Sequence, residues 1–268
     1  MRFRTGSAQR WKYAYASVVG TSHTKTDTEC QDSSLCTVHR LPNRSEVLIA
    51  AVADGAGSAQ MASVASAMTA QSFTESVKNF LSAGNGIEAI SREFVVKWLT
   101  SLQVAIIKRA EENETDIRNF ASTLLGAIIG DESAVFVQLG DGALVVSMRN
   151  RIEEYGWIFW PQQGQYANQT YFVTDETAAD FINHLYINDA IDDLAVFSDG
   201  LQSIALHTQS KTAHAPFFRA MFKPLLDQPS GYLEGLSATL GKYLGSDAVN
   251  QRTDDDKTLI LATRRSQT

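Results

Sequence analysis

Five aspartates stand in similar sequence contexts, most of them at the end of a short apolar run. They are Asp32 in CQDSS, Asp54 in VADGAG, Asp141 in LGDG, Asp199 in FSDG and Asp255 in DDDKT. Any one of them alone is explained as a turn residue, because Asp-Gly is a common turn dipeptide. Carboxylates that meet at one edge of a sheet repel each other, however, and this repulsion is costly unless cations lie between them. Ligand sets made only of oxygen suit Mg²⁺ or Mn²⁺ better than Zn²⁺.

The predicted strands determine where these aspartates lie. Residues 47–53 (VLIAAVA) form an apolar run of strand length that ends at Asp54-Gly55, so we expect Asp54 at a strand end. Further strands are expected over residues 122–130, 134–140, 143–149, 194–197 and 258–262. The spacing predicts hairpins between the first three of these, the second one around an Asp141-Gly142 turn.

Helical periodicity predicts helices over residues 58–80, 87–112, 217–226 and 232–244. Strands thus come in clusters and helices in pairs, rather than in strict alternation. This order favours an α+β layered sandwich over a doubly wound parallel sheet. Because no repeat or linker divides the sequence, we expect residues 1–268 to form a single domain.

The composition limits the classes of function. With 268 residues, 44% of them apolar, the chain can bury a substantial core. No apolar run is long enough for a membrane span, and the first residues lack the apolar segment of a secretory signal, so we expect a cytoplasmic protein with no membrane partner. A formal charge of −7 argues against nucleic acid as a partner. Cys30 and Cys36 lack the spacing of a zinc site and are interpreted as reduced thiols.

The ordered series CQD, VADGAG, STLLGAII, LGDG, FSDG and DDDKTLI resembles the type 2C metal-dependent protein phosphatases. The resemblance is strongest to the compact bacterial members, in which GTSH precedes CQD, and it extends from about Gly20 to Ala262. Each motif alone is unspecific, but six in the right order are a strong signal. The resemblance implies an α-β-β-α four-layer sandwich with two central antiparallel β-sheets.

The resemblance also implies two divalent cations, Mn²⁺ or Mg²⁺, and assigns ligands to them. Asp54 would bridge the two ions, and the Gly55 carbonyl would supply another oxygen. Asp199 and Asp255 would complete the protein ligands of one ion. Asp32 would hold water molecules near the other ion.

A third, weaker cation site is implied at Asp141 together with Asp199. The implied reaction is the hydrolysis of phosphoserine and phosphothreonine by a water or hydroxide that bridges two ions, without a phosphoenzyme intermediate. The substrate would be a phosphorylated protein, such as a bacterial serine/threonine kinase or a target of such a kinase.

The sequence departs from the family pattern at two positions. Many members have a histidine after the bridging Asp-Gly pair, a candidate proton donor, whereas this chain has Ala56. An arginine that clamps the substrate phosphate commonly precedes CQD, where this chain has Asp27 and Thr28. The nearest cationic candidates are His23 and Lys25. We predict that His23, as a catalytic-site residue, contacts the substrate phosphate, with a structural hydrogen bond near the site as the alternative. Lys25 is a second candidate for the phosphate or a solvated loop residue.

Two assignments remain open in the sequence. Asp254 and Asp256 flank Asp255 and are alternative candidates for the metal ligand. We prefer Asp255 because the family ligand stands three residues before the Ser or Thr that opens the last strand, here Thr258. Four aromatic residues are interpreted as core or loop packing, with a peptide groove as the alternative. They are Trp157, Trp160, Tyr166 and Tyr171.

Two other functions are kept as alternatives to the phosphatase. One is a regulatory or binding module that retains the phosphatase fold with weak catalysis, which the absent His and Arg favour and the five retained acids oppose. The other is a two-metal hydrolase of nucleotides or nucleic acid. Against this second alternative, the chain lacks the basic surface that such substrates favour.

Overall fold

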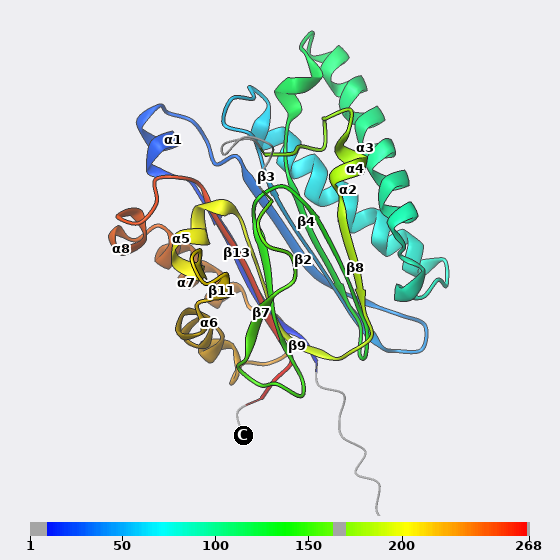
Figure 1. Ribbon diagram of the computed structural model, residues 1–268, viewed down its shortest axis with the longest axis vertical. Coiled ribbons are helices and arrows are strands. Elements are labelled where there is room, and N and C mark those ends of the chain that lie inside the picture. Colours follow the sequence, from blue (N-terminus) through cyan, green and yellow to red (C-terminus); the bar gives the residue numbers. More distant parts are fainter. Residues whose placement is uncertain (1–9, 163–169, 267–268) are drawn as a thin grey trace, which may run out of the picture.

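The computed structural model describes residues 10–162 and 170–266. Two β-sheets lie face to face, and helices cover the outer face of each sheet (Figure 1). This is the α-β-β-α sandwich that the motifs predicted. Within the described ranges, no helix has the length and apolar character needed to cross a membrane.

The first sheet has five strands in the order β2-β3-β4-β5-β8, and every neighbouring pair is antiparallel. Its strands are β2 (Asp32–Arg40), β3 (Glu46–Asp54), β4 (Leu124–Ile129), β5 (Ala134–Leu139) and β8 (Asn183–Ile187). Helices α2 (Ala62–Ser82) and α3 (Arg92–Glu112) cover its outer face, and the shorter α4 (Ala178–Phe181) lies beside them (Figure 1). Short 3₁₀ helices flank α3 at Ile87–Ala89 and Ile117–Phe120.

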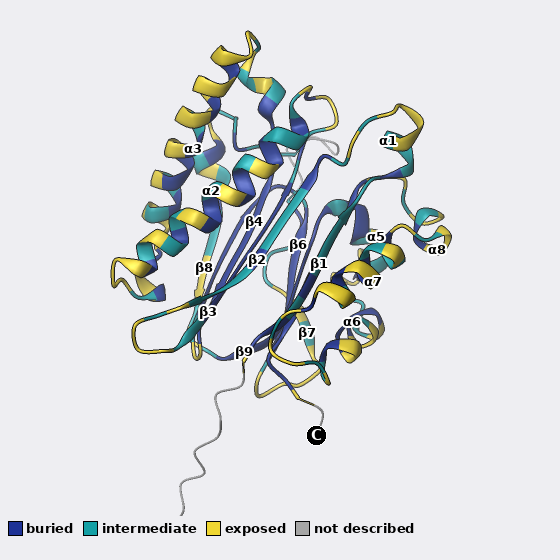
Figure 2. Ribbon diagram, turned by 180° about the vertical axis from the view of Figure 1, so that it is seen from behind, coloured by how far each residue is buried: buried dark blue, intermediate teal, exposed yellow. Residues whose placement is uncertain are grey.

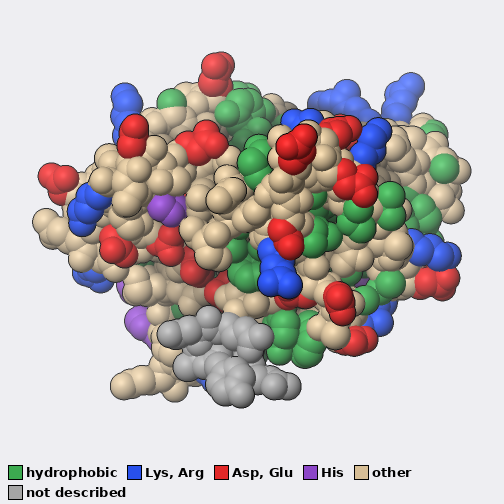
Figure 3. Space-filling model, turned by 90° about the horizontal axis from the view of Figure 1, so that it is seen from above, with side chains coloured by type: hydrophobic (Ala, Val, Ile, Leu, Met, Phe, Trp, Pro, Cys, Tyr) green, Lys and Arg blue, Asp and Glu red, His purple; other side chains and the backbone are tan. Residues whose placement is uncertain are grey.

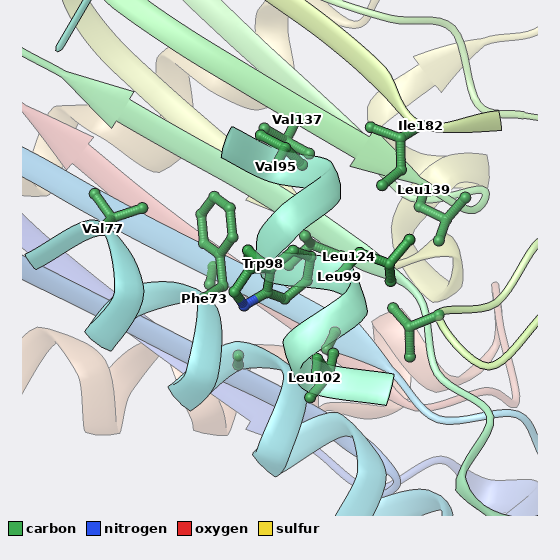
Figure 4. Packing of buried hydrophobic residues seen from close by; sticks show 14 of the residues in the cluster. Phe73, Val77, Val95, Trp98, Leu99, Leu102, Leu124, Val137, Leu139 and Ile182 are labelled. Carbon is green, nitrogen blue, oxygen red and sulfur yellow. The ribbon is translucent and has the colours of Figure 1, made fainter. Parts of the chain in front are cut away.

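Strand β3 shows why this sheet is buried on both faces. Successive side chains of a strand point to opposite faces. Val47, Ile49, Ala51 and Ala53 therefore join the core under α2 and α3, while Leu48, Ala50 and Val52 join the core between the two sheets. In the outer core, Phe73 of α2 meets Trp98 of α3 edge to face, with ring centroids 5.2 Å apart (Figure 4).

The second sheet has six strands in the order β12-β1-β13-β9-β6-β7. Its strands are β1 (Lys12–Val18), β6 (Ala143–Met148), β7 (Tyr155–Trp157), β9 (Ile191–Phe197), β12 (Gly231–Tyr232) and β13 (Lys257–Thr263). All pairs are antiparallel except the short edge pair of β1 and β12, which is parallel. A separate two-stranded ribbon is formed by β10 (Leu206–His207) and β11 (Thr212–Ala213).

The helices that cover the second sheet come from the C-terminal third of the chain (Figure 2). They are α5 (Gln202–Ala205), α6 (Ala215–Phe222), α7 (Glu234–Leu244) and α8 (Asp247–Asn250), with 3₁₀ turns at Asp199–Leu201 and Lys223–Leu225. Phe218 and Phe222 of α6 pack against Tyr155 of the sheet, and their ring centroids lie 5.4 and 5.7 Å from it. A further short helix, α1 (Thr21–Lys25), follows β1.

The predicted helices and apolar strands are found, but one predicted connection is wrong. Strands β4 and β5 form the expected hairpin. Strands β5 and β6 do not pair: β5 lies between β4 and β8, and β6 lies between β9 and β7 in the other sheet. The chain crosses from one sheet to the other at Gly140, whose φ of +112° favours glycine, so Asp141-Gly142 is part of a crossover and not of a hairpin turn.

Candidate active site

The acids that the sequence singled out come from both sheets and meet at one end of the sandwich. Strand β3 ends at Asp54, and β9 is followed directly by the 3₁₀ turn that begins at Asp199. Strand β13 runs antiparallel to β9, so Asp255, just before β13, lies beside the end of β9. The crossover places Asp141 at the same end. Figure 3 looks onto this end of the molecule, where Asp and Glu side chains lie close to histidine side chains.

A pocket of about 200 Å³ opens where these strand ends meet. Six of the seven predicted site residues line it: His23, Asp54, Gly55, Asp141, Asp199 and Asp255. Asp32 does not line the pocket; it is the cross-strand partner of Asp54 and is 7% exposed. Lys25 is exposed and does not line the pocket either. The structure thus brings the predicted residues together, with Asp32 buried beside them.

Two glycines that follow site aspartates are required by close packing. A Cβ atom on Gly55 would overlap the backbone of Ala62 at the start of α2, and one on Gly200 would overlap the carbonyl oxygen of Asp256. Both glycines have negative φ values, so neither is needed for a left-handed turn. The Asp-Gly pairs at these positions therefore bring neighbouring backbone close to the acids.

Burial and mutual repulsion raise the pKa values of the acids. The pKa of Asp54 lies well above its usual range, first because the carboxyl is buried and then because Asp32 and Asp199 are nearby. The pKa of Asp199 is raised to about 6, again by burial first and then by Asp141 and Asp255. Acids held together in this way favour the protonated form unless positive charge is supplied.

Asp32 and Asp141 have hydrogen-bond donors of their own. Ser198 Oγ donates to Asp32 Oδ2 at 2.7 Å, yet burial still raises the pKa of Asp32 to about 7. Thr170 Oγ1 donates to Asp141 Oδ2 at 2.6 Å, and here too burial outweighs the donor and raises the pKa. These hydroxyl groups orient the carboxylates without neutralising them.

The donor set fits hard divalent cations. Asp32 Oδ1 and Asp199 Oδ1 are buried and accept no hydrogen bond in the described structure, and such unpaired acceptors are costly. Carboxylate and carbonyl oxygens are the ligands that Mg²⁺ and Mn²⁺ prefer. Within residues 10–162 and 170–266, the structure contains no group of three or more His, Cys, Asp or Glu side chains whose present positions could hold a metal ion.

His23 is held by a buried carboxylate. Its Nδ1 lies 3.0 Å from Asp256 Oδ1, and Asp256 is 3% exposed. Because a carboxylate only accepts, Nδ1 carries the hydrogen, and Nε2 is the ring nitrogen left for other partners. Asp256 also accepts from the backbone N–H groups of Gly20 and Gln31, each at 2.6 Å. Asp256 is thus fully engaged with the N-terminal segment, while Asp255, and not Asp254, lines the pocket.

Several pocket residues were not foreseen. Thr123 Oγ1 accepts a hydrogen bond from Asp54 N at 3.0 Å, and Thr170 and Phe172 come from the loop before α4. The positioning role of Asp256 was also missed. The only signal for Thr123 was its place at the start of a predicted strand, and the loop residues had none.

The aromatic residues considered for a peptide groove pack elsewhere. Trp157 and Trp160 meet at a centroid distance of 5.6 Å, and Trp157 Nε1 donates to Lys211 O at 2.7 Å. Tyr171 stacks on Phe181 at 3.8 Å. None of these three lines the acidic pocket. Tyr166 lies outside the described residues.

Comparison with known proteins gives consistent matches. The chain is 32% identical over 253 residues to serine/threonine-protein phosphatase 3 of Escherichia coli (strain K12), covering 94% of this chain and 98% of that protein. A crystal structure of a bacterial serine phosphatase matches with a TM-score of 0.59 at 15% identity, covering 96% of this chain and 98% of that one.

A second solved structure, RsbX in complex with magnesium, matches with a TM-score of 0.52 at 15% identity and covers 96% of each chain. At such identities these structures bear on the fold alone. The family model for protein phosphatase 2C matches residues 19–245. The chain therefore belongs to the protein phosphatase 2C family, which confirms the family and the phosphatase class of enzyme that its motifs predicted.

Proposed function

We propose that this chain is a metal-dependent serine/threonine protein phosphatase. The observation that supports this most is the pocket in which Asp54, Asp141, Asp199 and Asp255 meet at the ends of strands from both sheets. A relative that is 32% identical is named a serine/threonine-protein phosphatase. We further propose that residues 1–268 act as one domain in the cytoplasm.

The proposed cation ligands are the residues that the motifs assigned. Asp54 would be shared between two divalent ions, Mn²⁺ or Mg²⁺, and the Gly55 carbonyl would supply another oxygen ligand. Asp199 and Asp255 would complete one of the two sites. Asp32 would hold water on the other side, and Asp141 with Asp199 would form the weaker third site. When bound, two such ions would lower the pKa of a water nucleophile and neutralise charge on the phosphoryl oxygens.

His23 is proposed as the proton donor to the leaving oxygen of serine or threonine. Ala56 offers no titratable group, whereas His23 lines the same pocket and is oriented by Asp256. The Asp256 carboxylate would stabilise the imidazolium through Nδ1–H, and Nε2–H would then be transferred to the alkoxide. The proton ends on the leaving hydroxyl, and the neutral ring is recharged from solvent.

A phosphorylated protein is the proposed substrate, such as a bacterial serine/threonine kinase or a target of one. Nucleic acid is not expected to bind, because the net charge is −7 and the pocket is lined by acids. Because Asp27 and Thr28 stand where the family arginine commonly lies, His23 is the cationic candidate from the N-terminal segment that lines the pocket.

Metal dependence is the experiment that tests this function. We expect hydrolysis of a phosphothreonine peptide only after Mn²⁺ or Mg²⁺ is added to chelator-treated protein, because oxygen ligands at an open site release such ions readily. Full turnover by protein that elemental analysis finds free of metal would contradict the two-ion mechanism. Saturable Mn²⁺ binding without turnover on peptides would instead support the regulatory module.

A further inference from the structure

A second hollow lies among the helices that cover the six-stranded sheet, separate from the acidic pocket. It is a groove of about 660 Å³ lined by residues of α5, α6, α7 and α8, and it shares no lining residue with the acidic pocket. Its volume falls within the range of about 300–1,000 Å³ that is typical of small-molecule sites. A ligand bound in the groove would therefore contact different residues from a substrate bound in the acidic pocket.

Two residues that line the groove carry hydrogen-bond donors without partners among the described residues. In the described part of the chain, the Arg252 guanidinium pairs with no carboxylate and the Tyr243 hydroxyl makes no hydrogen bond. The two groups are close: burial raises the pKa of Tyr243, and the charge of Arg252 lowers it. Among the described lining residues there is no Asp or Glu. Arg252 is exposed, and a charged donor without a carboxylate partner, in a groove whose described lining has no acid, favours an anionic ligand.

His214, which also lines the groove, offers an acceptor. His214 Nδ1 lies 3.0 Å from the carbonyl oxygen of Ile204, so in the neutral ring Nδ1 carries the hydrogen and Nε2 accepts. The ring of His207 lies 4.7 Å from that of His214, centroid to centroid. Phe217 and Met221 of α6 line the wall and provide an apolar surface on which a ring can lie.

We propose that this groove binds a small aromatic carboxylate that carries a hydroxyl group on its ring. The carboxylate accepts from Arg252 and from the Tyr243 hydroxyl, the ring packs on Phe217 and Met221, and the ring hydroxyl donates to His214 Nε2. A carboxylate suits the site better than a phosphate dianion does, because Arg252 is the one permanently charged group among the described lining residues and matches a single negative charge. The proposal goes beyond phosphatase activity and does not depend on it.

The test is a binding titration followed by amide NMR, with 4-hydroxyphenylacetate as the probe. We expect saturable binding with a Kd on the order of 1 mM, which is typical of so small a ligand. Shifts should centre on Ser203 and Val249 in the groove and leave Gly55 in the acidic pocket unmoved. The neutral 4-hydroxyphenylethanol lacks the carboxylate and should bind about tenfold more weakly.

Two variants locate the carboxylate. Arg252→Gln should weaken the probe about tenfold by removing a charged donor, and Tyr243→Phe, which keeps the ring, should weaken it by a smaller factor. Arg44→Gln is the matched control, because Arg44 is also a surface arginine without an ion pair among the described residues, and it lies in the β2–β3 turn. Equal affinity in Arg252→Gln and wild type, equal affinity for the neutral analogue, or the absence of saturable binding would each overturn the proposal.

Discussion

Replacement of Asp256 by asparagine is expected to destabilise the protein although the side chain keeps its size. The carboxylate accepts three hydrogen bonds from the N-terminal segment: Gly20 N and His23 Nδ1 on Oδ1, and Gln31 N on Oδ2. Asparagine has one acceptor oxygen and one NH₂ group. If the oxygen faces Gly20 and His23, the NH₂ group meets the N–H of Gln31, so that two donors oppose each other in a buried site.

The cost follows from these contacts. A hydrogen bond to a charged group contributes about 1.5–3 kcal/mol and a neutral one about 1 kcal/mol. The variant loses one charged bond, leaves the Gln31 N–H unpaired and turns two charged bonds into neutral ones. The lost bond costs about 1.5–3 kcal/mol and each weakened bond about 0.5–2 kcal/mol, so the free energy of unfolding should fall by at least about 2.5 kcal/mol.

Urea unfolding followed by circular dichroism measures this difference, with chelator present so that metal affinity does not contribute. Asp254→Asn is the matched control, since Asp254 is exposed and its side chain makes no hydrogen bond within the described residues. The control should change the free energy of unfolding by less than about 0.5 kcal/mol. Equal stability of the Asp256 variant and wild type would show that these three contacts do not hold the N-terminal segment.

Two further predictions concern the chemistry. His23→Gln should slow the hydrolysis of a phosphothreonine peptide on the order of 10²-fold and that of 4-nitrophenyl phosphate far less, because an aryl leaving group departs without a proton. Adding Ala56→His to this variant should restore the peptide reaction in part. Equal losses on both substrates would exclude His23 as the proton donor. Asp54→Asn should lower kcat/KM on the order of 10²-fold or more, and Asp141→Asn by about tenfold or less, since only Asp54 is assigned to both principal ions. Calorimetric Mn²⁺ titrations of the Asp54 and Asp141 variants, run beside the kinetics, check this order, and an active Asp54 variant with wild-type metal affinity would refute the assignment.

The strands that carry the acids were predictable because they are buried on both faces. Strands buried on both faces have continuous apolar sequences, and residues 47–53 and 194–197 are examples. A turn signal in the sequence marks the end of each run. Asp54 and Asp199 could therefore be placed at strand ends from local sequence alone. The convergence of these ends on one pocket came from the family resemblance, because local pattern does not determine which strands are neighbours.

The crossover at Asp141-Gly142 shows where local reasoning failed. The dipeptide is the same as in a two-residue hairpin, and apolar runs flank it on both sides. The positive φ at Gly140 and the pairing of β6 with β9, which lies more than 40 residues later in the chain, decide the outcome. The role of Asp256 was hidden for a similar reason, since its partner Gly20 is 236 residues away.

The division of the acids between two sheets ties the geometry of the site to the packing of the sandwich. Asp32 and Asp54 belong to the five-stranded sheet, whereas Asp199 and Asp255 adjoin strands of the six-stranded sheet. The apolar core between the sheets holds them face to face, while repulsion among the buried acids opposes their approach at this end. Ions placed between acids of both sheets would remove that repulsion and join the sheets directly. A site built on one sheet would lack this link between the sheets. A substitution in the inter-sheet core, such as one at Leu125 or Val196, should therefore alter metal affinity although no metal ligand is changed.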